Sequence, residues 1–220
     1  MTRRAWILIS VPVLLVLALV LGPLAYAALQ DDAAPAPRVQ AQPEDAVLSA
    51  GTDGVWTVAD GSTAGYRVDE VLNGADVTVA GTTDRVTGTV EVADGRLAGA
   101  QVTVDVASIA TDSGRRDAYF RDNVMDVAAH PTATFAVREP ADLPELSGEP
   151  VTVPVAGELT LAGETRPVQV ELSVVRTAGG VDVSGSVPVT FADFGIEPPD
   201  LGFVSVEDQG SVEFLVHLVR

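Results

Sequence analysis

The chain has 220 residues, of which 47% are hydrophobic and only 5% are aromatic. This length fits one all-β domain with extensions, and the apolar content is sufficient for a hydrophobic core. Acidic residues outnumber basic residues by 31 to 13, and the net charge of −18 disfavours binding to nucleic acid or to anionic lipid headgroups. The chain has no cysteine, which excludes disulfides, thiolate metal ligands and thiol nucleophiles.

Residues 1–29 are predicted to form an N-terminal transmembrane helix. Arg3 and Arg4 precede an uncharged run of apolar residues from 5 to 29. At about 1.5 Å per residue, such a run spans a hydrocarbon core of about 30 Å. The preceding arginines place the rest of the chain on the extracytoplasmic side of the cell membrane. A cleaved signal segment is the alternative, because a Gly-Pro pair at 22–23 breaks the helix and residues 25–27 resemble a cleavage site.

Residues 30–54 are predicted to form a linker. Two aspartates begin this segment, three prolines stiffen it, and its apolar residues follow neither a helical nor a strand period. We expect the linker to be extended and solvated and to hold the following domain off the membrane surface.

Residues 55–220 are predicted to form an all-β domain. Apolar and polar residues alternate over 102–106, 168–172, 181–183 and 212–214, which places one face of each strand against a core. Turn-forming pairs recur at short intervals, such as the Asn-Gly pair at 73–74 and the Asp-Gly pair at 94–95. Eight or more strands with this spacing are typical of a sandwich or barrel.

One segment, residues 112–127, interrupts the strand pattern. Asp112 or Ser113 is suited to cap a short helix, in which Tyr119 and Phe120 would face inward and the charged residues outward. A helix in this position would cover one end of a barrel, where the mouth of a ligand site would lie.

Catalytic motifs are scarce. His217 falls on the polar side of its strand, His130 precedes a proline, and there is no Gly-x-Ser-x-Gly sequence. No His cluster or calcium-binding loop indicates a metal, so we expect no catalytic residue, metal or cofactor. An enzyme using two of the many carboxylates is the least favoured alternative, and it would require a polar cleft.

Three blocks of sequence, in order, are similar to the YceI-like, polyisoprenoid-binding family. The blocks are 104–111 with the Arg-Asp pair at 116–117 and the segment 131–135, the hairpin 157–168, and the closing residues 194–196 with 204–214. The resemblance covers about residues 55–219. The chain departs from the family at 64–66, 124–126 and 130, and no ligand contact is transferred from those positions. Gly157 and Gly163 are interpreted as turn residues, and Arg116 with Asp117 as a salt-bridged loop.

The resemblance implies an extended antiparallel, lipocalin-like β-barrel with one short helix and an apolar lumen that binds an isoprenoid or another long-chain lipid. A cell-envelope spacer or protein-interaction domain without a small ligand is the alternative, and it would lack an elongated cavity. Strand phase and the capping segment select the predicted ligand-binding residues. They are Tyr66, Val68, Val102, Val104, Val106, Tyr119, Phe120, Phe135, Leu159, Leu161, Val170, Leu172, Phe191 and Phe194.

Overall fold

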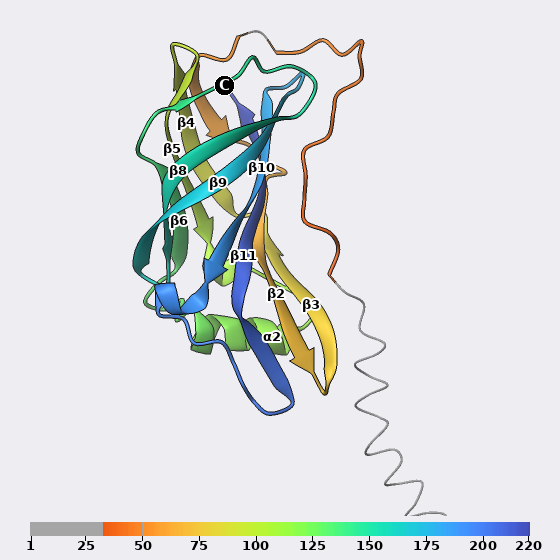
Figure 1. Ribbon diagram of the computed structural model, residues 1–220, viewed down its shortest axis with the longest axis vertical. Coiled ribbons are helices and arrows are strands. Elements are labelled where there is room, and N and C mark those ends of the chain that lie inside the picture. Colours follow the sequence, from red (N-terminus) through yellow and green to blue (C-terminus); the bar gives the residue numbers. More distant parts are fainter. Residues whose placement is uncertain (1–32, 50) are drawn as a thin grey trace, which may run out of the picture.

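The computed structural model describes residues 33–49 and 51–220 (Figure 1). Within these ranges, no helix is long and apolar enough to cross a membrane. The predicted transmembrane or signal segment, residues 1–29, lies outside the described residues.

Eight antiparallel strands close into a barrel, which confirms the predicted all-β fold. Around the ring they are β1 (Gly54–Val58), β4 (Val86–Ala93), β5 (Arg96–Asp105), β6 (Thr132–Val137), β8 (Val151–Leu161), β9 (Glu164–Arg176), β10 (Val181–Thr190) and β11 (Val204–Val219). The short strand β1 closes the ring, because Thr57 lies opposite Thr89 of β4 on one side and opposite Val219 of β11 on the other.

A hairpin extends the barrel wall at one end. Its strands are β2 (Thr63–Leu72) and β3 (Ala75–Thr83), and β2 pairs with β11 over residues 204–215. β3 is the last strand in the order of the sheet, and a single bridge joins its Thr82 to Ala110. The two-residue strand β7 (Ala141–Asp142) pairs with β5. The hairpin projects beyond the ring at the end away from the C-terminus (Figure 1).

Tight turns set the register of these strands. Asn73 and Gly74 have φ angles of 51° and 85°, and Asp94 and Gly95 have angles of 53° and 70°. Two consecutive residues with positive φ form the turn whose twist matches that of paired strands, and Asn-Gly and Asp-Gly favour it. The predicted turns at both positions are confirmed. The turn predicted at Gly163 is confirmed as well, with a φ angle of 82°.

A helical segment covers the same end of the barrel as the hairpin (Figure 1). After β5, the 3₁₀ turn η1 (Val106–Ser108) leads to helix α2 (Gly114–Tyr119), which continues into the π-helical turn η2 (Phe120–Val124). The Ser113 hydroxyl accepts a hydrogen bond from the backbone N–H of Arg116 and caps the helix. The predicted capping helix is therefore confirmed, but its expected orientation was wrong in part, because the charged Asp117 is buried and Tyr119 is 37% exposed. On the other side of the mouth, the 3₁₀ turn η3 (Phe191–Phe194) precedes the loop to β11.

Residues 33–49 are extended, as predicted, but they lie against the barrel. The backbone N–H of Ala33 donates to Thr78 O at 3.0 Å, and that of Val39 donates to Ser184 Oγ at 3.1 Å. Further along, Ser49 donates from its N–H to Thr177 O at 2.9 Å. None of these residues is buried, as expected of a solvated segment, but hydrogen bonds attach them to strands β3 and β10 and to the β9–β10 loop.

Candidate functional site: an apolar cavity with a polar mouth

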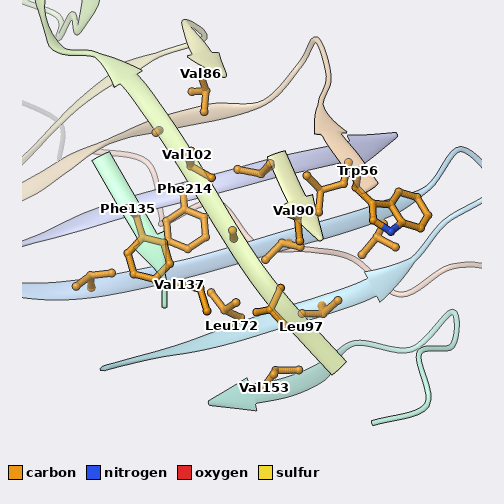
Figure 2. Close-up of a pocket in the computed structure, with 18 of the residues that line it drawn as sticks. Trp56, Val86, Val90, Leu97, Val102, Phe135, Val137, Val153, Leu172 and Phe214 are labelled. Carbon is orange, nitrogen blue, oxygen red and sulfur yellow. The ribbon is translucent and has the colours of Figure 1, made fainter. Parts of the chain in front are cut away.

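The upper half of the barrel, near the C-terminus in Figure 1, contains an apolar cavity of about 140 Å³ (Figure 2). Of the residues that line it, only Thr52 and Thr134 are of a polar type, and the others are Val, Leu, Ala, Phe and Trp. Most of these side chains come from the inner faces of the ring strands, and Ala64 of β2 with Thr52, Leu143 and Leu146 of loops complete the lining. Trp56 lines this cavity and is 3% exposed, with its indole N–H donating to Thr52 O at 2.8 Å. The deep cavity is therefore a water-poor compartment.

Two aromatic rings of the deep cavity lie against glycines of neighbouring strands. A Cβ atom built on Gly157 would be 2.6 Å from Cζ of Phe135, and one built on Gly185 would be 2.6 Å from Cζ of Phe214. Any larger residue at these positions would push the ring away from the barrel wall. The prediction of a turn at Gly157 was wrong, because Gly157 lies within β8 and makes room for Phe135.

A second, larger cavity of about 660 Å³ lies at the end covered by α2. Its walls come from β2, β3, α2, η2, η3 and the loop before β11. The two cavities share four lining residues, which are Ala64, Val104, Ala133 and Val212. They therefore adjoin, and the larger cavity forms the mouth of the deep one.

Tyr66 connects the barrel wall to the cap within the mouth cavity. Its ring stacks on Phe120 of η2 with centroids 4.8 Å apart and an angle of 21° between the planes. Burial raises the pKa of the Tyr66 phenol to about 12, although the nearby Arg116 guanidinium acts in the opposite direction. The hydroxyl therefore remains protonated at neutral pH. It provides a neutral donor in a largely apolar wall.

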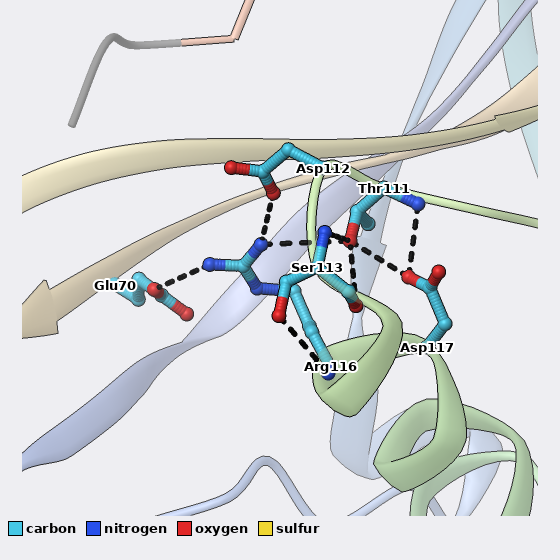
Figure 3. A network of polar contacts seen from close by, with 6 residues as sticks. All are labelled: Glu70, Thr111, Asp112, Ser113, Arg116 and Asp117. Carbon is cyan, nitrogen blue, oxygen red and sulfur yellow. Dashed lines mark hydrogen bonds and ion pairs between the residues drawn. The ribbon is translucent and has the colours of Figure 1, made fainter.

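A polar network attaches the start of α2 to the barrel (Figure 3). Arg116 pairs with Asp112 and, at 3.4 Å between Nη2 and Oε1, with the buried Glu70 of β2. Asp117 is also buried, and its Oδ1 accepts hydrogen bonds from the backbone N–H and the hydroxyl of Thr111 at 2.9 and 2.7 Å. The interpretation of Arg116 with Asp117 as a salt-bridged loop was wrong, because both residues lie in helix α2, the ion pairs of Arg116 are with Asp112 and Glu70, and Asp117 accepts hydrogen bonds from Thr111.

A family model for the YceI-like domain matches residues 56–218 of the sequence. The chain belongs to the YceI-like domain family. The structure is similar to a polyisoprenoid binding domain from Saccharophagus degradans implicated in plant cell wall breakdown, with a TM-score of 0.60 and 19% identity over 75% of this chain and 97% of that one. It is also similar to BcnA from Burkholderia cenocepacia, with a TM-score of 0.56 and 21% identity over 70% of this chain and 96% of that one. A comparison with curated proteins gives no match.

Twelve of the fourteen predicted ligand-binding residues line one of the two cavities of this YceI-like barrel. In the deep cavity they are Val102, Val104, Phe135, Leu159 and Leu172. In the mouth they are Tyr66, Val68, Val104, Val106, Tyr119, Phe120, Leu161 and Phe191. Val170 and Phe194 are buried in the core but line neither cavity. Contact of any of these side chains with a ligand stays a prediction.

Several cavity residues of the YceI-like barrel were absent from the prediction. Phe214 and Val216 of β11 line the deep cavity. The alternation at 212–214 places Phe214 on the same face as Val212, and this signal could have identified Phe214. Leu201 and Phe203 line the mouth from a loop, where no period indicates which side chains face inward.

The histidines of the YceI-like domain lie outside both cavities. The Nδ1 atom of His217 is 2.8 Å from Asp182 Oδ1. Ser62 is nearby, but it is 1% exposed, donates its hydroxyl to Ala59 O and accepts the backbone N–H of His217. A serine held in this way does not point at a substrate. Among the described residues, no group of acidic or histidine side chains is arranged to hold a metal ion.

Proposed function

We propose that this protein binds a long apolar lipid, an isoprenoid or an acyl chain, with the chain running along the 660 Å³ mouth cavity toward the deep cavity and the polar end at the mouth. The observation that carries the proposal is that two largely apolar cavities adjoin inside the barrel, where they share Ala64, Val104, Ala133 and Val212 in their linings. A hydrocarbon chain gains free energy when it leaves water for such a lining. The printed description of the Saccharophagus degradans neighbour as a polyisoprenoid binding domain supports the same ligand class.

The mouth contains the groups that would hold a polar lipid end. Tyr66 offers a protonated hydroxyl, and Arg115 is an exposed cation on the cavity lining. Arg115 forms no ion pair with the part of the chain that the structure describes. Ligand pockets usually combine an apolar lining with a few polar groups of this kind.

The proposed location is the extracytoplasmic face of the cell membrane, with residues 1–29 as a single-pass anchor. Arg3 and Arg4 before the uncharged run support this orientation. A spacer without a ligand would need no elongated cavity. An enzyme using paired carboxylates would need a polar cleft, whereas the deep cavity is lined by apolar side chains.

The test is to identify what the exported protein carries. A protease site inserted at residues 31–32 allows the described part of the chain to be released from the membrane without detergent. Native mass spectrometry of the released protein, followed by organic extraction, is expected to show a bound mass that corresponds to an isoprenoid or acyl lipid. Protein without a bound mass, also after incubation with isoprenoid lipids, would contradict the proposal.

A matched pair of variants locates the ligand. Val102 lines the deep cavity from β5, and its neighbour Gln101 is exposed on the other face of the same strand. Val102→Trp fills the lumen and is expected to abolish the bound mass, while Gln101→Trp is expected to leave it unchanged. Equal retention by both variants would place the lipid outside the barrel.

A further inference from the structure

The mouth cavity continues onto the surface as a patch of exposed apolar side chains. Leu201 and Phe203, on the loop before β11, line the cavity and are 49% and 58% exposed. Tyr119 of α2 lines it as well and is 37% exposed. The loop is attached to the β2–β3 turn, because the backbone N–H of Asn73 donates to Phe203 O at 2.8 Å. We call Tyr119, Leu201 and Phe203 the apolar rim.

The extended segment brings the N-terminal part of the chain to the same end of the barrel. Ala33 is hydrogen-bonded to Thr78 O, and the Arg67 guanidinium donates to Ala34 O at 2.6 Å. Thr78 is three residues from Ala75, where β3 leaves the hairpin turn, or about 10 Å along the strand. In Figure 1 the segment meets the barrel beside β3, far from the C-terminus.

The length of chain that precedes Ala33 limits how far the barrel can stand from a membrane. The uncharged run ends at Leu29, and the four steps from Leu29 to Ala33 span at most about 14 Å when fully extended. If residues 5–29 span the bilayer, the hydrogen bond at Thr78 holds the rim end of the barrel next to the membrane. The end that holds Trp56 then points away from it.

We propose that the apolar rim docks on the lipid bilayer in which the chain itself is anchored. In this position Leu201 and Phe203 lie at the boundary between headgroups and acyl chains, and a lipid passes from the bilayer into the mouth without crossing water. The inference rests on the proposed function and on residues 1–29 being an anchor. The net charge of −18 disfavours attraction to anionic headgroups, so apolar insertion holds the surface in place.

The first experiment uses the full chain in vesicles of neutral phosphatidylcholine. Because the protein has no cysteine, Phe203→Cys and Leu201→Cys each give a single site for an environment-sensitive dye. Val55→Cys is the matched control, since Val55 is 61% exposed on β1 at the opposite end of the barrel. Nitroxide lipids are expected to quench the dyes at 201 and 203 but not the dye at 55, and 1 M salt is expected to leave the quenching unchanged.

Three results would overturn the inference. The first is quenching of the dye at 203 that is no greater than quenching of the dye at 55. The second is loss of the quenching in 1 M salt. The third is energy transfer between labelled copies without quenching by lipid, which would show that the rim is a contact between two chains. The outcome is independent of whether a ligand is found in the lumen. Quenching at the rim of a protein that carries no lipid would therefore support docking and contradict the proposed function.

The second experiment tests what docking does. The double variant with Leu201→Asp and Phe203→Asp is expected to take up lipid from vesicles at least about tenfold more slowly, the factor that corresponds to 1.4 kcal/mol in the barrier. Both residues also line the mouth cavity, so the final lipid occupancy is measured alongside, and uptake from vesicles is compared with uptake of lipid dispersed in detergent, where no bilayer is present. The loss of rate is expected to be larger with vesicles. Uptake at the wild-type rate would contradict the inference.

Discussion

At the end of the barrel that holds Trp56, eight strands close on themselves around a small apolar cavity, whereas at the α2 end the wall is completed by a hairpin, a short helix and loops. Side chains in the first region are held by close packing. In the second region, ion pairs and hydrogen bonds of Arg116 and Asp117 attach the cap to the wall. The two regions therefore differ in the interactions that keep them rigid, which are packing at the closed end and polar contacts at the cap. The closed end is suited to hold an apolar chain, and we expect the cap to open without disrupting the ring of strands.

The largest effect is expected from removing the aromatic side chain at the closed end. Trp56→Ala should lower the free energy of unfolding by about 3–5 kcal/mol, because the indole is buried and fills the space above the deep cavity. Urea unfolding of the released described part of the chain measures this change. Arg220→Gln removes the cation that lies 4.5 Å from the ring centroid, together with its hydrogen bond to Asp53 O, and should cost about 1–2 kcal/mol. Equal costs for the two variants would show that the closed end is not held by packing.

A glycine substitution in the barrel wall tests how closely the Phe214 ring packs against that wall at the closed end. Gly185→Val should lower the free energy of unfolding by about 1–3 kcal/mol and reduce the bound lipid, because the new side chain drives the Phe214 ring into the lumen. Gly99→Val is the control, since the nearest atom to a Cβ at Gly99 is Val137 O at 3.9 Å. Both losses should be absent in the control, and lipid binding that survives Gly185→Val would argue against a ligand chain in this part of the lumen.

At the mouth, the effect of a substitution should be local. Asp117→Ala leaves the N–H and hydroxyl of Thr111 without their acceptor, at a cost of about 1 kcal/mol or more. Amide hydrogen exchange should become faster in residues 112–127 while the ring strands keep their protection, and bound lipid should dissociate faster. Asp122→Ala, at an exposed position on the same cap, is the control. Uniform loss of protection across the barrel would contradict a separable cap.

The smallest effect at neutral pH is expected for Tyr66→Phe, which keeps the stack on Phe120 and removes only the hydroxyl. The wild type should differ from this variant at high pH. Since folding raises the pKa of Tyr66 from 10.0 to about 12, the phenol favours the folded state fully below pH 10, and this contribution falls as the pH rises from 10 to 12. The loss should approach about 1.4 kcal/mol per pH unit. Unfolding measured across this range should show the steeper decline in the wild type only.

The inner faces of the strands could be predicted from the sequence because period-two alternation is local. Val102 and Leu172 illustrate this, since each lines the deep cavity from the strand in which the alternation was found. Val170 was also assigned to the lumen from its phase. Val170 is buried in the core but lines neither cavity. Residues outside β9, such as those of η3, pack against that strand, and the alternation within β9 does not reveal them.

The features that escaped prediction depend on partners far apart in the sequence. Gly157 was interpreted as a turn because glycine is common in turns, whereas its role depends on the Phe135 ring across the sheet. The attachment of Ala33 to Thr78 uses backbone atoms, which carry no residue-type information. The cap was found because a capping serine is a local feature, whereas the exposed rim at Phe203 was missed because its loop has no period.

The closure of the barrel by β1 has a consequence for the order of folding. Thr57 of β1 donates its hydroxyl to Val219 O of β11, across a separation of 162 residues. While the chain is being synthesised, β1 and β4 emerge long before β11 is available. Their edges then present unpaired N–H and C=O groups to other chains. We expect slow final closure of the barrel, as for other folds with distant strand pairs, and a risk of edge-to-edge association between chains until β11 has arrived.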